Sequence, residues 1–134
     1  MILVDSSVLI DVIEQKPVWA EWSVERLFEC ARQQALVINI VIYAEISRSF
    51  VDAFAEDKFL KEAGIKLDPI SSAAAFAAAR AHTAYRAAGG ARLATLPDFF
   101  IGAHAQEQDH TLLTRDPVRI RTYFPAVRLI CPEV

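Results

Sequence analysis

Short apolar segments alternate along the chain with longer segments of helical pattern, and this alternation restricts the fold more than any other feature. The apolar segments consist mostly of Leu, Ile and Val, which is typical of strands covered on both faces. We expect strands at 1–4, 35–38, 65–67, 111–113 and 128–130, and helices at 7–14, 19–33, 40–50, 52–63, 71–88, 97–108 and 117–123. Strands that alternate with helices pair in parallel through right-handed crossovers. The sequence therefore predicts an α/β sandwich.

Length and composition predict one domain over residues 1–134. No Pro/Gly-rich linker divides the chain, and 54% of its residues are hydrophobic, which is enough for a core. The first apolar run, Met1 to Val4, is too short for a signal peptide or a membrane span. Cys30 and Cys131 lie far apart and have no metal-ligand spacing. These features indicate a cytoplasmic protein with reduced thiols and no membrane association.

The distribution of basic residues is uneven. The net charge is −3, which argues against coating nucleic acid by bulk charge, yet every basic residue after Lys66 is an arginine. The planar guanidinium can bind two phosphate oxygens at once. Four arginines are candidates for phosphate contacts, and solvated surface positions are the alternative: Arg86, Arg92, Arg115 and Arg119.

Four carboxylates lie close behind predicted strands or at helix starts: Asp5, Glu45, Asp98 and Asp116. The first and last of them follow strands directly. Glu45 lies in the second turn of the helix after the second strand, and Asp98 begins the helix that leads into the fourth. Because the carboxyl ends of parallel strands share one edge, where ligands bind, we expect these four side chains to meet there.

Each carboxylate also has a local interpretation that needs no shared site. Asp5 could cap the first helix, and Asp98 could complete a capping box with the threonine three residues before it. Asp116 could cap the last helix ahead of a proline. Glu45 could pair with Arg48, one helical turn later. The local and the shared interpretations remain open at this level.

A cluster of carboxylates without matching bases favours a cation. The charges would raise one another's pKa values, and a divalent hard cation that takes oxygen ligands relieves this. Cysteine and histidine do not have the spacing to compete. His104 lies six positions after Asp98 and points to another side of the helix, so we expect structural roles for all three histidines.

Four segments carry a resemblance to a known family: VDSSVLID, VIYAEI, LPDFFIGAHA and LLTRDPVRIRTYFP. Together they resemble a PIN domain, and specifically the VapC toxins of bacterial toxin–antitoxin pairs, over essentially the whole chain. The resemblance implies a PIN-like three-layer α/β/α sandwich and a Mg²⁺- or Mn²⁺-dependent endoribonuclease, a hydrolase. It carries the catalytic role over to the four carboxylates already named.

The resemblance also implies a division of roles. The metal ligands would be Asp5, Asp98 and Asp116. Glu45 would orient or deprotonate the attacking water, while Ser6 and Thr114 would support the site by hydrogen bonds to a carboxylate or a bound water. Hydrolysis would leave a 5′-phosphate and a 3′-hydroxyl. RNA preference would then come from shape and groove contacts.

The partners implied by the resemblance are an RNA substrate, tRNA or rRNA, and a cognate antitoxin. We expect a homodimer, and a heterotetramer or larger assembly with the antitoxin. An antitoxin arginine could enter the acidic cleft, and its apolar part could lie on the helices between Val41 and Leu60. That region offers Phe50, Val51, Phe54 and Phe59. Some of these must face the core, and all four could instead be core or dimer contacts.

Two other functions remain open. A PIN-type nuclease with a housekeeping role in RNA processing would share every feature above except the antitoxin. A receiver-like binding module would need an acidic pair after the first strand, a phosphoacceptor aspartate after the third strand and a lysine after the last. The last strand here ends in Cys131 and Pro132, and no lysine follows Lys66.

Overall fold

The computed structural model describes residues 1–90 and 96–132. Five short strands alternate with seven helices among these residues. The elements are β1 (Ile2–Val4), α1 (Ser6–Ile13), α2 (Ala20–Gln33), β2 (Leu36–Ile38), α3 (Ile40–Ser47), α4 (Ala53–Glu62), β3 (Ile65–Leu67), α5 (Ser72–Ala87), α6 (Leu96–Glu107), β4 (Thr111–Leu113), α7 (Val118–Tyr123) and β5 (Leu129–Ile130). Each predicted strand and helix is present, with most bounds shifted by one or two residues.

The five strands form one parallel sheet in the order β3-β2-β1-β4-β5. The N-terminal strand β1 is therefore central, with Ile2 aligned to Leu36 on one side and to Thr111 on the other. The chain first extends the sheet through β2 and β3, and then returns across it to add β4 and β5. This reversal places a topological switch point between β1 and β4, which is where open parallel sheets bind ligands.

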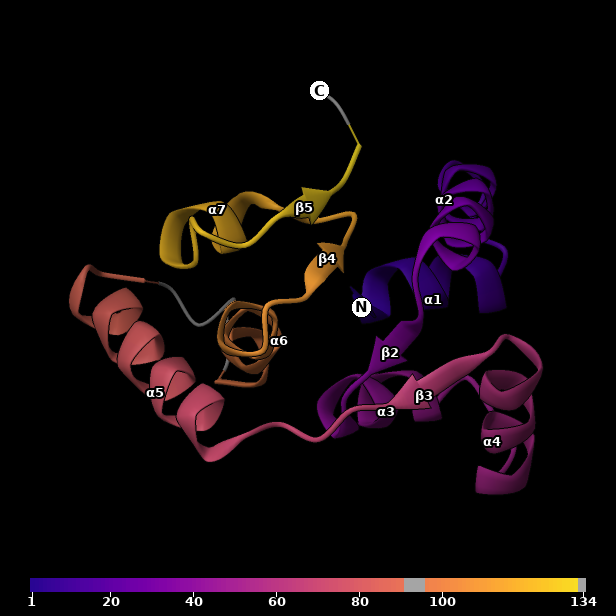
Figure 1. Ribbon diagram of the computed structural model, residues 1–134, viewed down its shortest axis with the longest axis horizontal. Helices are drawn as coiled ribbons and strands as arrows, with labels where there is room; N and C mark the ends of the chain where they lie inside the picture. The colour runs from indigo at the N-terminus through magenta and orange to yellow at the C-terminus, as the bar shows by residue number, and fades with distance from the viewer. Residues whose placement is uncertain (91–95, 133–134) are drawn as a thin grey trace.

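Helices cover both faces of the sheet, as the α/β/α prediction requires. In Figure 1, α1, α2 and α4 lie on one side of the strands, and α5, α6 and α7 lie on the other. This division follows from right-handed crossovers, since the direction of strand addition reverses after β3. Helix α3 contacts both α1 and α6. Among the described residues, no helix combines the length and apolar character that a membrane span requires.

The core is built on the three central strands, whose residues are almost entirely buried. The edge strands differ. Lys66 and Leu67 in β3 are exposed, and both residues of β5 are half-buried. The prediction that all five strands are covered on both faces is therefore wrong at the edges, where a strand has one neighbour and helices reach it incompletely.

The strand order also decides against the receiver-like alternative. A flavodoxin-like receiver has the order 2-1-3-4-5, whereas the order here is β3-β2-β1-β4-β5. A third strand at the edge cannot supply a central phosphoacceptor.

Candidate active site

The switch point brings together residues from the two ends of the chain. Asp5 follows β1 directly, and its backbone N–H donates to the carbonyl oxygen of Leu113 in β4 at 2.9 Å. Thr114 follows β4 and is buried. Because β1 and β4 are parallel neighbours, the loops after them leave the sheet side by side. Residues separated by more than a hundred positions thus share one site.

Asp5 occupies the N-cap position of α1, but its carboxylate makes no capping hydrogen bond. Instead, its Oδ2 accepts hydrogen bonds from Ser7 Oγ at 2.8 Å and from Thr114 Oγ1 at 2.7 Å. The capping interpretation of this carboxylate is therefore wrong. Burial raises the pKa of Asp5, the two hydroxyl donors oppose that rise, and the charge of Asp116 adds to it.

Glu45 projects from α3 toward the loop after β1. Its Oε1 accepts a hydrogen bond from Ser6 Oγ at 3.0 Å, and the same hydroxyl oxygen lies 3.5 Å from Asp5 Oδ1. Ser6 therefore joins the two carboxylates. Burial raises the pKa of Glu45, and the charges of Asp5 and Asp98 raise it further. Among the described residues, Glu45 forms no salt bridge with Arg48, so the local pairing interpretation is wrong.

Asp98 and Asp116 complete the group from the opposite side. Asp98 lies in the first turn of α6 and is half-buried. Its predicted capping partner, Thr95, lies outside the described residues. Asp116 does not cap α7, because Pro117 takes the N-cap position and the helix begins at Val118. The backbone N–H of Asp116 instead donates to Thr114 Oγ1 at 3.1 Å.

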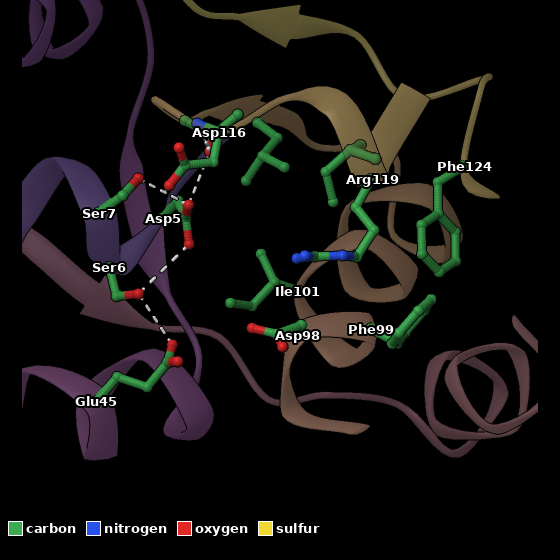
Figure 2. A pocket seen from close by; sticks show the side chains of 13 residues that line it. Asp5, Ser6, Ser7, Glu45, Asp98, Phe99, Ile101, Asp116, Arg119 and Phe124 are labelled. Carbon is green, nitrogen blue, oxygen red and sulfur yellow. Dashed lines mark hydrogen bonds between the residues drawn. The ribbon is translucent and has the colours of Figure 1, made fainter. Parts of the chain in front are cut away.

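All four predicted carboxylates line one cavity of about 130 Å³. Figure 2 shows Asp5 and Asp116 on one wall, Glu45 on α3 below them, and Asp98 on α6 across from Asp5. Arg119 of α7 points into the same space (Figure 2). The sheet edge and the adjacent helices thus bring four acidic side chains into one small cavity.

The chemistry of these donors fits a divalent hard cation. Within the described residues, no lysine or arginine forms a salt bridge with Asp5, Glu45 or Asp116. The pKa values of Asp5 and Glu45 are raised, first by burial and then by the neighbouring acids. A cation with oxygen ligands would relieve both the burial of charge and the repulsion.

The sequence profile of the PIN domain family matches residues 2–125. The chain belongs to the PIN domain family. This match confirms the predicted PIN resemblance, and the sheet and its two helical layers agree with the sandwich expected of such a domain. None of the curated proteins matches the sequence.

Solved structures share the fold over nearly the whole chain. The VapBC2 complex of Rickettsia felis, bound to a DNA fragment from its promoter, has 18% identity, a TM-score of 0.72 and 98% coverage of each chain. VapBC-1 of nontypeable Haemophilus influenzae has 15% identity, a TM-score of 0.71 and 98% coverage of each chain. VapC20 of Mycobacterium tuberculosis, described as a Sarcin-Ricin loop cleaving toxin, has 14% identity and a TM-score of 0.68, with 96% of this chain and 99% of that chain covered.

The four candidate arginines of the PIN domain have different environments. Arg119 lines the acidic cavity, whereas Arg86 is exposed in the last turn of α5 and does not line it. Arg115 donates from Nε and a terminal nitrogen to the buried carboxylate of Asp11, at 2.8 and 3.1 Å. Arg92 lies outside the described residues. The structure therefore brings one of the described three, Arg119, to the acidic group.

Two residues of this PIN domain escaped the sequence analysis. Ser7 bridges the loops after β1 and β4, since it donates to Asp5 and accepts from the backbone N–H of Arg115 at 3.2 Å. Asp11 is fully buried in α1 and accepts from Arg115 and from Ser23 Oγ at 2.9 Å. The pair of serines after Asp5 could have indicated Ser7. Nothing local connects Asp11 to a residue more than a hundred positions later.

A second polar group of the PIN domain lies apart from the acidic cavity. Asp68 Oδ2 is 2.9 Å from His104 Nε2 and 2.7 Å from His110 Nε2, and both histidines are buried. The expectation of structural roles for the histidines did not include this shared carboxylate, because Asp68 is distant from both in sequence. The three ligand atoms lie close enough together to hold a metal ion.

Proposed function

We propose that this PIN domain is a Mg²⁺- or Mn²⁺-dependent endoribonuclease that acts as the toxin of a toxin–antitoxin pair. One observation carries the proposal, namely the convergence of Asp5, Glu45, Asp98 and Asp116 on one cavity at the switch point of the sheet. Acidic groups gathered in one cavity, two of them with raised pKa values, are typical of catalytic sites. Membership of the PIN family, and the likeness to VapBC complexes and to a Sarcin-Ricin loop cleaving toxin, support the substrate class.

The cation would be held by Asp5, Asp98 and Asp116, either directly or through water, as Mg²⁺ sites commonly retain several waters. When bound, Mg²⁺ or Mn²⁺ would supply positive charge that neutralises the phosphate and favours ionisation of water. Ser7 and Thr114 orient the Asp5 carboxylate by donating to its Oδ2. Its Oδ1 lies 3.5 Å from Ser6 Oγ, a long contact, and we assign this oxygen to the cation.

Glu45 is the candidate general base for the attacking water. Its carboxylate lies on the wall of the cavity and is oriented by the hydroxyl of Ser6 on Oε1. The raised pKa of Glu45, caused first by burial, makes it a better proton acceptor than an ordinary surface glutamate. In-line hydrolysis of this kind leaves a 5′-phosphate and a 3′-hydroxyl and makes no use of the ribose 2′-hydroxyl.

The RNA strand would reach the carboxylates along a groove of about 860 Å³ next to the cavity. The groove shares Asp116 and Arg119 with the acidic cavity and continues past Arg121, Trp19 and Tyr123. Arginines beside aromatic rings suit a single-stranded nucleic acid, because guanidinium groups contact phosphates and rings stack on bases. Arg115 lines the groove as well, but Asp11 holds its guanidinium, so we assign the phosphate contact to Arg119.

An antitoxin would restrain this activity in the cell. The cluster of carboxylates attracts a basic side chain, and an arginine can bind a carboxylate through two hydrogen bonds. Of the four apolar candidates for its docking surface, Val51 and Phe54 are 92% and 78% exposed. Phe50 and Phe59 instead pack on each other, with ring centroids 5.5 Å apart, and against the core. We therefore propose Val51 and Phe54 as antitoxin contacts, in a homodimeric or heterotetrameric assembly.

The test is cleavage of RNA by the purified chain. We expect cleavage with Mg²⁺ or Mn²⁺, none with EDTA, and restoration when the metal is returned in excess. End-mapping should find 5′-phosphates. Cleavage that survives exhaustive chelation would contradict the metal mechanism.

A growth experiment separates the toxin from a housekeeping nuclease. Inducing the chain alone should arrest growth, and co-induction with the neighbouring small reading frame should restore it. Asp98→Asn, induced to the same level, is the matched control and should be harmless. Equal growth with and without the neighbour, from active enzyme, would favour the housekeeping role.

A further inference from the structure

A continuous chain of buried and partly buried hydrogen bonds connects helix α3 to helix α6 outside the acidic cavity. Asn39 is the N-cap of α3, and its Nδ2 lies 3.0 Å from His104 Nδ1 on α6. His104 Nε2 contacts Asp68 Oδ2 at 2.9 Å, and His110 Nε2 contacts the same oxygen at 2.7 Å. Gln108 Nε2 also donates to it, at 2.8 Å. Asn39 and His104 are both fully buried.

The capping role of Asn39 determines the direction of each bond in this chain. Asn39 Oδ1 accepts from the backbone N–H of Ile42 at 2.9 Å, so the amide nitrogen faces His104. An amide nitrogen only donates, hence His104 Nδ1 accepts and the proton of the neutral ring is on Nε2, which donates to Asp68. Burial lowers the pKa of His104, which agrees with a neutral ring in this position.

The same directions argue against a metal ion at these residues, although two histidines and a carboxylate suit zinc. An ion on His104 Nε2 would move the ring proton to Nδ1. That proton would then face the NH₂ group of Asn39, and two donors would oppose each other. Rotating the Asn39 amide would relieve this clash only by removing the N-cap of α3. The hydrogen-bond pattern therefore favours a structural link.

The link lies at the same sequence separation from two of the site carboxylates. Glu45 is six positions after Asn39, and Asp98 is six positions before His104. At a rise of 1.5 Å per residue, the backbone of Glu45 or Asp98 is about 9 Å along the helix axis from the linked residue of the same helix. The two offsets run in opposite chain directions, and α3 contacts α6. The hydrogen bond between Asn39 and His104 thus joins the two helices whose residues Glu45 and Asp98 line the same cavity.

We propose that the Asn39–His104 hydrogen bond, braced by Asp68 and His110, sets the register of α3 against α6 and so positions Glu45 beside Asp98. This inference rests on the proposed function, in which these carboxylates serve one divalent cation. Without a link, the two like charges would separate when no cation is bound. His104 and Asn39 are positioning residues, since neither lines the acidic cavity.

The sharpest test uses Asn39→Ser and a matched exchange of another helix cap. Serine caps a helix about as well as asparagine but lacks the amide that reaches His104. The control is Asp52→Ser, because Asp52 caps α4 in the same way, through Ala55 N–H at 2.8 Å, and α4 carries none of the four carboxylates. We expect Asn39→Ser to weaken Mn²⁺ binding about tenfold, the lower end of the effect of losing a ligand-orienting contact. Asp52→Ser should leave Mn²⁺ binding unchanged.

A second pair of variants tests the bond itself. In His104→Gln the side-chain amide can accept a hydrogen bond from Asn39 and donate one to Asp68. The leucine side chain in His104→Leu can form neither hydrogen bond. We expect His104→Gln to retain most of the wild-type Mn²⁺ affinity and His104→Leu to lose it. At saturating Mn²⁺, the turnover of Asn39→Ser should return to within about threefold of wild type, because the variant changes the assembly of the site and none of its reacting groups.

The outcomes separate this inference from the proposed function. Mn²⁺ binding is measured by electron paramagnetic resonance on the purified chain without RNA. Wild-type binding by Asn39→Ser, at whatever stability, would overturn the inference alone. Failure of the wild-type chain to bind Mn²⁺ at the carboxylates would overturn the proposed function. If the wild-type chain bound one equivalent of zinc and His110→Ala bound none, these residues would form a metal site and the structural link would be wrong.

Discussion

Two sets of carboxylates in this protein have opposite environments. Asp11 and Asp68 are paired with cationic or hydrogen-bond-donating side chains, Asp11 with Arg115 and Asp68 with two histidines. In the acidic cavity, the carboxylates of Asp5 and Glu45 accept hydrogen bonds from hydroxyl groups. Among the described residues, Asp5, Glu45 and Asp116 have no salt bridge. The difference appears in the pKa values. That of Asp68 is lowered by its partners despite burial, and those of Asp5 and Glu45 are raised.

This difference teaches how a binding site can be told from a structural contact. A paired carboxylate contributes to folding, and its removal leaves the partner unsatisfied. Ionised carboxylates that repel one another oppose folding, so their presence together favours a functional role. The four predictions below test this comparison, beginning with the largest expected effect.

The largest effect concerns Asp98→Asn, which should reduce RNA cleavage about 100-fold or more while far-UV circular dichroism stays unchanged. A bound cation contributes several kcal/mol to transition-state stabilisation, and each 1.4 kcal/mol is a factor of ten. The matched control is Asp109→Asn at an exposed residue with a positive φ, a conformation that asparagine tolerates. Retained turnover with a loss of helix stability would assign Asp98 to capping instead.

Removing a paired carboxylate should act on stability. Asp11→Ala leaves the Arg115 guanidinium without its partner, and we expect a loss of about 3 kcal/mol in the free energy of unfolding. Urea denaturation measures it. Glu14→Ala in the turn after α1 is the control, since Glu14 is exposed and its contacts with Ser49 and Lys16 contribute little. A loss under 1 kcal/mol for Asp11→Ala would break the comparison.

Asp68→Asn should destabilise the chain by about 2 kcal/mol at pH 7, because both histidines and Gln108 lose a charged acceptor. The pKa of Asp68 is lower in the folded chain than in the unfolded chain. Its contribution is therefore fully present above the unfolded pKa and is lost as pH falls through the folded one. The difference between variant and wild type should shrink below about pH 4, as followed by thermal unfolding. A constant difference down to pH 2 would show that ionisation of Asp68 is irrelevant.

The smallest effect has the opposite sign. Glu45→Gln should raise the melting temperature of the metal-free chain by about 3 °C at pH 8. The folded pKa of Glu45 is above the unfolded one, so its contribution is present below the unfolded pKa and lost as pH rises through the folded pKa. The gain should vanish near pH 4, and Mg²⁺ should stabilise wild type more than the variant. Calorimetry in EDTA that finds the variant less stable at pH 8 would show that Glu45 is compensated after all.

Much of the fold and of the acidic site could be predicted from the sequence. The five apolar runs and the intervening helical patterns correspond to the observed elements, because hydrophobic periodicity and helix-ending residues are local signals. The positions of the four carboxylates behind strands or at helix starts were sufficient to expect them at one edge. Local capping rules were misleading at Asp5 and Asp116, where hydroxyl groups of the site compete successfully for the carboxylate or the backbone.

The sequence by itself thus determined the order and type of the elements and the acidic character of the switch point. Only the tertiary structure decided which polar groups become partners. Thr114 reaches Asp5, Arg115 reaches Asp11, and His104 reaches Asn39 because of the strand order and the packing of α3 on α6. The physical reason is one of range. Burial of one face of a helix or strand produces a periodic pattern of apolar residues that can be read locally. A hydrogen bond between distant elements depends instead on where the whole chain places them.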